Sequence, residues 1–148
     1  MTISTPAFKN GENIPSKYTC DGENVSPLLK ISGVPTEAKS LVLIMDDPDS
    51  PSGTWLHWSV WNISPKTTEI PENSAPTGAI EGTTSFGKVG YGGPCPRSGE
   101  HRYFFRLYAL DCELNLSAGA ERSQLEHAMA GHVLTETELM GRFRRQNQ

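Results

Sequence analysis

Short segments in which apolar residues run together or alternate with polar ones dominate the chain, and turn residues separate these segments. Ser40–Met45 contains a continuous apolar run, which is typical of a strand buried on both faces. Gly53–Ile63 and His101–Leu110 alternate with a period of two and are rich in aromatic residues. The pattern predicts three long strands, and the second is expected to be central because it holds all the tryptophans.

Weaker patterns predict shorter elements around these strands. Ile3–Phe8, Ser26–Ile31 and Thr83–Phe86 have the composition of short strands, whereas residues 64–82 are rich in proline and glycine and predict a loop. Val133–Phe143 alternates as a strand does, although part of its spacing also fits a helix. We favour the strand.

One segment near the C-terminus has helical spacing. Glu121–Gly131 is predicted to be a helix, capped by Ser117 or an adjacent polar residue, and His127 and His132 are expected at the surface on or just after it. Residues 144–148 are expected to be frayed. Many short strands and one late helix predict a mainly β fold, a sandwich of antiparallel-rich sheets with one short helix near the C-terminus.

The bulk composition limits domain organisation and function. The 148 residues suit a single domain spanning 1–148. A formal net charge of -4, with 13 basic and 17 acidic residues, argues against a general nucleic-acid-binding protein. No run of about 18 apolar residues is present, so no transmembrane segment is expected. The N-terminus lacks the basic and apolar parts of a secretory signal.

The cysteines indicate the redox environment and therefore the cellular compartment of the protein. Cys20, Cys95 and Cys112 are an odd set without a CxxC spacing. Three free thiols suit a reducing environment better than a disulfide framework does, so we expect a cytoplasmic protein.

Candidate chemistry gathers where the first long strand ends. The turn Asp46–Pro51 holds three aspartates and two prolines, and the prolines stop the strand and stiffen the turn. His57 lies on the following strand, and His101 opens the strand at 101–110. Two histidines beside carboxylates can form an anion site whose charge changes near neutral pH.

A glycine-rich loop precedes His101, and structural explanations compete with the functional ones. Residues 87–99 include five glycines and two prolines, and such a loop can point backbone N–H groups at an anion. Aspartates beside prolines commonly form turns, and Asp49 is expected to cap its own. By parity His57 shares a face with Trp55 and Trp61, which also suits a core histidine.

Four motifs follow one another along the chain: Asp47–Pro51, Trp55 with His57, Gly90–Pro94 and Gly99–Tyr103. In combination, these motifs resemble the phosphatidylethanolamine-binding protein family, which includes the Raf kinase inhibitor proteins. The resemblance extends over nearly the whole chain and is nearest the bacterial and archaeal Raf-kinase-inhibitor-like branch. It implies a β sandwich with a small pocket at one end of the sheet, which in that family binds phosphate, acetate, cacodylate or a phospholipid head group.

The resemblance also implies which residues form the pocket. Asp47 and the two histidines would orient the anion, the Gly93 N–H would donate to it, and Pro51 and Trp55 would shape the walls. The full set of implied anion-binding positions is Asp47, Pro51, Trp55, His57, Gly93, Pro94, His101 and Tyr103.

Two further residues are expected to support the pocket. Arg102 faces the other side of its strand by parity, so we expect a structural ion pair with an aspartate of the acidic turn, and Asp49 is assigned a structural role with it. The C-terminal helix that borders the pocket in eukaryotic members is expected to be missing. A more open pocket, or a symmetric homodimer that covers it, would follow.

Three functions remain open at this point. The first is a non-catalytic protein that binds phosphate or a phosphorylated group and regulates a kinase or another partner. The second is a hydrolase that uses Asp47, His57 and His101 for acid–base or metal-assisted chemistry. The third is a kinase or protease inhibitor that acts through its surface loops. No cofactor is expected, and no metal-ligand spacing is evident in the sequence.

Overall fold

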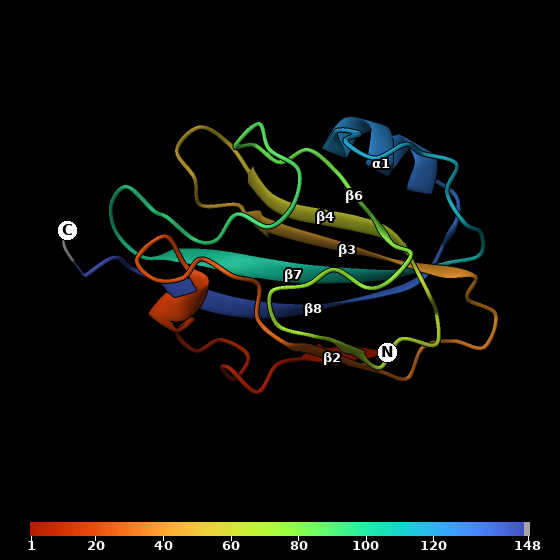
Figure 1. The fold of residues 1–148 in the computed structure, drawn as a ribbon, viewed down its shortest axis with the longest axis horizontal. Helices are drawn as coiled ribbons and strands as arrows, with labels where there is room; N and C mark the ends of the chain where they lie inside the picture. Colours follow the sequence, from red (N-terminus) through yellow and green to blue (C-terminus); the bar gives the residue numbers. More distant parts are fainter. Residues whose placement is uncertain (147–148) are drawn as a thin grey trace.

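A five-stranded antiparallel sheet forms the centre of the computed structural model, which describes residues 1–146. Its strand order is β6-β4-β3-β7-β8, so the strands predicted at 40–45, 53–63 and 101–110 are neighbours (Figure 1). The strands are β3 (Ser40–Asp47), β4 (Trp55–Ile63), β6 (Ile80–Glu81), β7 (His101–Leu110) and β8 (Val133–Phe143).

A smaller antiparallel sheet covers one face of the large sheet, and a helix covers the other (Figure 1). The small sheet has the order β1-β2-β5. Its strands are β1 (Thr2–Ser4), β2 (Leu29–Ser32) and β5 (Glu69–Ile70); the helices are η1 (Ser16–Tyr18), a 3-10 turn, and α1 (Arg122–Met129).

Alternate residues of β3 supply both apolar cores. Leu43 packs into the core shared with the small sheet, whereas Val42 and Ile44 pack into the core beneath α1, which contributes Leu125 and Met129. Both faces of β3 are therefore excluded from water, which is why its sequence is a continuous apolar run rather than an alternation. The mainly β fold with two antiparallel sheets and one α-helix is confirmed for the described residues.

The observed element boundaries agree with the strands that the strongest patterns predict and differ from several weaker predictions. The strands predicted at 101–110 and 133–143 have those bounds. Thr83 makes only an isolated bridge with Val89, so the strand predicted at Thr83–Phe86 is wrong. β5 and β6 lie instead within 64–82, which was predicted to be a loop. Helix α1 begins with a capping box between Glu121 and Gln124, not with a cap from Ser117.

A β-bulge at His57 gives this side chain a different orientation from the one that the sequence predicts. Met45 pairs with Trp58 and Asp46 pairs with Leu56, so β4 has one extra residue between them. After the bulge, Trp61 faces the core beneath α1, whereas His57 is separated from it. The prediction that His57 shares a face with Trp61 is therefore wrong, because a period of two cannot continue through a bulge.

A disulfide between Cys20 and Cys95 contradicts the expectation of three free thiols. The two residues are 75 positions apart in sequence, and the fold brings their Cα atoms to 5.4 Å. Only Cys112 is free. No short sequence spacing signals such a pairing, since tertiary structure alone creates it. The argument from free thiols to a reducing cytoplasm loses its basis.

Within residues 1–146, no helix is long and apolar enough to cross a membrane.

Candidate anion-binding site

A pocket of about 450 Å³ lies where β3 ends and where β4 and β7 begin. Because these neighbouring strands are antiparallel, these ends meet at one edge of the large sheet. Six of the eight predicted binding positions line the pocket. These are Asp47, Pro51, Trp55, His57, His101 and Tyr103.

Asp47 holds His101 in a fixed orientation. The Nδ1 atom of His101 lies 2.7 Å from Oδ2 of Asp47, and both side chains are buried. A carboxylate accepts hydrogen bonds, so Nδ1 of His101 is the donor. The other carboxylate oxygen of Asp47 accepts the backbone N–H of Asp49 at 2.8 Å. Nε2 is therefore the ring nitrogen of His101 that remains for a ligand.

His57 is held by a backbone carbonyl instead of a carboxylate. Its Nδ1 atom donates to the Gly92 carbonyl oxygen at 2.6 Å, and the Gly92 N–H donates back to the His57 carbonyl at 2.9 Å. Burial lowers the pKa of His57 below its ordinary value, so the ring is neutral at pH 7. A neutral ring with a proton on Nδ1 has its lone pair on Nε2, which can accept a proton from a ligand.

Tyr103 lies between the two histidines and has an unpaired hydroxyl. The centroid of its ring is 5.3 Å from that of His57 and 6.4 Å from that of His101. Its hydroxyl is buried, and residues 1–146 offer it no hydrogen-bond partner. Burial, and then the negative charge of Asp47, raise the pKa of Tyr103. The hydroxyl therefore stays protonated and can donate to a ligand.

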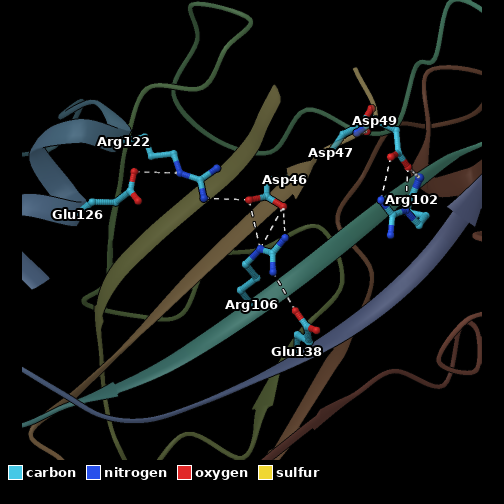
Figure 2. A network of polar contacts seen from close by, with 8 residues as sticks. All are labelled: Asp46, Asp47, Asp49, Arg102, Arg106, Arg122, Glu126 and Glu138. Carbon is cyan, nitrogen blue, oxygen red and sulfur yellow. Dashed lines mark hydrogen bonds and ion pairs between the residues drawn. The ribbon is translucent and has the colours of Figure 1, made fainter. Parts of the chain in front are cut away.

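Each aspartate of the acidic turn has partners of its own (Figure 2). Asp49 accepts two hydrogen bonds from the guanidinium of Arg102, both at 2.9 Å. These bonds lower the pKa of Asp49 from 3.8 to about 2. The predicted structural ion pair of Arg102 is confirmed. The expectation that Asp49 caps its own turn is wrong, because Asp47 accepts that backbone N–H.

Asp46 anchors the other side of the turn. It is buried, and its carboxylate lies 3.1 Å from Arg106 of β7 and 2.8 Å from Arg122 of α1 (Figure 2). Glu138 and Glu126 in turn pair with these arginines. Arginines therefore pair with Asp46 and Asp49, whereas the Asp47 carboxylate accepts a hydrogen bond from His101.

The glycine loop supports the pocket by close packing and not through the predicted anion contact. The Gly93 N–H donates to Oδ1 of Asn24 at 2.8 Å, so in this structure it does not serve as a donor to an anion. A Cβ atom at Gly93 would lie 2.3 Å from the carbonyl oxygen of Tyr18, so only glycine fits there. Pro94 does not line the pocket either, and its carbonyl accepts the backbone N–H of Cys20.

Among the pocket residues that were not anticipated from the sequence, three add an aromatic ring or a positive charge. Phe86, 41% exposed, packs edge-on against both Trp55 and His57. Arg97 and Arg145 add two positive charges to the lining. Arg97 lies within the glycine loop at 87–99 and could have been inferred from that neighbourhood, whereas no pattern marks Arg145.

The C-terminal segment reaches the pocket through Arg145. Nε of Arg145 pairs with Oδ1 of Asp21 at 3.0 Å, which fixes the side chain beside the pocket. The fraying expected for residues 144–146 stays a prediction. The part of that prediction that concerns 147–148 lies outside the described residues.

Known proteins resemble the chain over nearly its full length. A family model described as phosphatidylethanolamine-binding protein matches residues 4–144. A protein of Methanothermobacter thermautotrophicus named UPF0098 protein is 53% identical over 150 residues, which cover 98% of this chain and 99% of the relative. A UPF0098 protein of Chlamydia trachomatis is 45% identical over 148 residues, covering 97% of this chain and 98% of the relative.

Solved structures agree with these matches. The crystal structure of a C. trachomatis protein described as a phosphatidylethanolamine-binding protein homolog superposes with a TM-score of 0.93 at 43% identity, covering 97% of both chains. That of YbcL from E. coli, described as a member of the mammalian family, gives 0.91 at 28% identity and covers 98% of both chains. The chain therefore belongs to the phosphatidylethanolamine-binding protein family.

Proposed function

We propose that the protein is a non-catalytic binding protein for phosphate or a phosphorylated group. The observation that carries the proposal is the convergence of three unused polar atoms in one pocket. These are Nε2 of His57, Nε2 of His101 and the unpaired hydroxyl of Tyr103. A buried hydroxyl without a partner costs about 1–3 kcal/mol, which a ligand oxygen would recover.

The hydrogen bonds of the two histidines favour phosphate over sulfate. The Asp47 carboxylate accepts a hydrogen bond from Nδ1 of His101, which leaves Nε2 of that ring to contact an anionic oxygen. Neutral His57 can accept a hydrogen bond from the hydroxyl of a monoprotonated phosphate. Sulfate has no such proton at neutral pH. The pocket is therefore expected to prefer phosphate to sulfate.

The remaining lining indicates how the rest of the ligand is received. Trp55 and Phe86 form an aromatic wall, and Arg97 and Arg145 supply positive charge. Such a mixed surface suits a phosphate ester, such as a phospholipid head group, more than the free ion. A phosphorylated side chain of a kinase or another partner protein offers the same chemistry.

An acid–base hydrolase is the second candidate, and the Asp47–His101 pair favours it. A carboxylate that orients an imidazole at 2.7 Å is the arrangement that general bases use. Against it, Cys95 in the pocket wall is in a disulfide and cannot act as a thiolate nucleophile. The metal-assisted form gains no support, because Asp47, His57 and His101 do not bring three ligand atoms within metal reach of one another.

Calorimetric titration at pH 7 with phosphate, phosphoethanolamine and sulfate tests the proposal. Phosphate should bind more tightly than sulfate. Replacing His101 with alanine should weaken phosphate binding by about 10- to 100-fold, as expected for the loss of a charged hydrogen bond. The matched control is His127→Ala on the outer surface of α1, which should bind as the wild type does.

Two outcomes decide against this account. Equal phosphate affinity in the wild type and in His101→Ala would show that this pocket does not bind phosphate. If the wild type hydrolysed a generic phosphomonoester and His101→Ala did not, the protein would be a hydrolase and not a binding protein.

A further inference from the structure

A second group of reactive side chains lies at the opposite end of β7 from the pocket. Asp111 and Cys112 directly follow the strand, and His132 directly precedes β8. Their carboxylate oxygen, sulfur and imidazole nitrogen all lie within 4.8 Å of one another. Among residues 1–146, no other set of three such side chains comes this close.

The backbone fixes the three residues relative to one another. The Asp111 N–H donates to the His132 carbonyl at 3.0 Å, which continues the pairing of β7 with β8 beyond the strand ends. The His132 N–H donates to the Met129 carbonyl at 3.0 Å. The Ser40 hydroxyl donates to the Cys112 carbonyl at 2.6 Å. The three donors therefore belong to a rigid edge of the sheet and not to a free loop.

We propose that Asp111, Cys112 and His132 form a binding site for a divalent transition-metal ion of the zinc type. Thiolate, imidazole and carboxylate are the three ligand classes that zinc takes, whereas a thiolate ligand disfavours magnesium and calcium. Three protein ligands leave the fourth tetrahedral position to water. Binding exchanges the thiol proton of Cys112, which goes to solvent, for a metal–sulfur bond.

Access and geometry both suit this site. The side chains of His132 and Asp111 are 45% and 47% exposed, so an ion can enter from solvent. Nδ1 of His132 lies 2.8 Å from Oδ1 of Asp111. Ligand atoms at about 2.0–2.3 Å from one zinc ion are slightly further apart than this, so a small rotation of exposed side chains would admit the metal.

The metal site and the anion pocket are separate. His101 and Tyr103 begin β7, and Asp111 follows its last residue, so about ten strand residues, or roughly 30 Å, lie between them. Because Cys20 and Cys95 are in a disulfide, any thiolate–metal signal from the oxidised protein reports on Cys112 alone.

Titration of the oxidised wild-type protein with Co²⁺ tests the proposal. One equivalent should produce the thiolate-to-cobalt charge-transfer band and the visible bands of tetrahedral cobalt, and zinc should displace both. Cys112→Ser should abolish the charge-transfer band. His132→Ala should weaken binding at least about tenfold. The matched control is His127→Ala, which lies on α1 outside the cluster and should leave the titration unchanged.

X-ray absorption of the zinc-loaded wild type provides a test that needs no variant. One sulfur and otherwise nitrogen or oxygen neighbours are expected around the metal. The proposal would be overturned by a first shell without sulfur or by a cobalt titration without the charge-transfer band. It would also be overturned if His132→Ala bound cobalt as tightly as the wild type does.

Discussion

Tyr103 is buried and Tyr91 is partly buried, and their hydroxyl groups differ in hydrogen bonding. The Tyr91 hydroxyl donates to the Tyr18 carbonyl at 2.7 Å, whereas the Tyr103 hydroxyl has no partner within residues 1–146. Removing a paired hydroxyl leaves its acceptor unsatisfied, but removing an unpaired one relieves a cost. The two positions therefore offer a matched comparison of a structural hydroxyl with one reserved for a ligand.

We expect Tyr103→Phe to leave the free energy of unfolding unchanged or to raise it by about 1 kcal/mol, and Tyr91→Phe to lower it by about 1–2 kcal/mol. Only Tyr103→Phe should lose phosphate affinity, by about tenfold. Urea denaturation and calorimetry measure the two effects. Equal destabilisation by the two substitutions would mean that the Tyr103 hydroxyl is paired in the free protein.

Asp49 makes a pH-dependent contribution to stability. Its hydrogen bonds from Arg102 hold its pKa at about 2, below the value of 3.8 for an unperturbed aspartate. A depressed pKa means that the stabilisation is fully present above about pH 4 and is lost as the pH falls toward 2. Asp49→Asn should therefore be less stable than the wild type at pH 7, and the difference should shrink below pH 4. Thermal melts from pH 7 to 3 would show this, and a difference that stayed constant would contradict it.

At the scale of elements, the Cys20–Cys95 disulfide fastens the turn after η1 to the loop that lines the pocket. It closes a loop of 75 residues in sequence separation. The double variant Cys20→Ser/Cys95→Ser should lower the free energy of unfolding by about 2–4 kcal/mol, because the unfolded chain is then less constrained. Cys112→Ser, which breaks no disulfide, is the control.

The same double variant should also bind phosphate less tightly, since Cys95 itself lines the pocket and Arg97 follows it. Calorimetry on the variant and on the Cys112→Ser control measures this. Unchanged affinity would show that packing of the glycine loop, without the disulfide, is enough to hold the pocket.

Elements differ in how well local sequence determined them. β3 and β7 were predictable because burial on one or both faces leaves a direct periodic signal. The bulge at His57 was not, because it depends on the pairing of β4 with β3. β5 and β6 have two residues each, too few for any period to be visible. The ion pair of Arg102 followed from strand parity, whereas that of Arg145 depends on tertiary contact with Asp21.

At the scale of the whole molecule, the fold separates two candidate sites by the length of β7. The motifs around Asp47 and His101 were sufficient to place the pocket, since the residues lie at neighbouring strand ends. The cluster of Asp111, Cys112 and His132 was not foreseen, because 20 positions separate its cysteine from its histidine and no metal spacing marks it. The homodimer expected from the sequence stays a prediction.

Because the two sites share no residue and lie far apart, their binding free energies should add. Phosphate affinity measured by calorimetry should be the same with and without one equivalent of zinc, and His132→Ala should bind phosphate as the wild type does. A change of more than about threefold would indicate coupling through the sheet and contradict the separation.

The most direct test of the central claim is a long-range ¹H–¹⁵N NMR spectrum of the imidazole side chains, recorded at pH 7 during a phosphate titration. The free protein should show His57 as the neutral form with its proton on Nδ1. Phosphate should shift the Nε2 signals of His57 and His101 together and leave His127 unchanged. If neither pocket histidine responds to millimolar phosphate, the pocket is not a phosphate site and the proposed function is wrong.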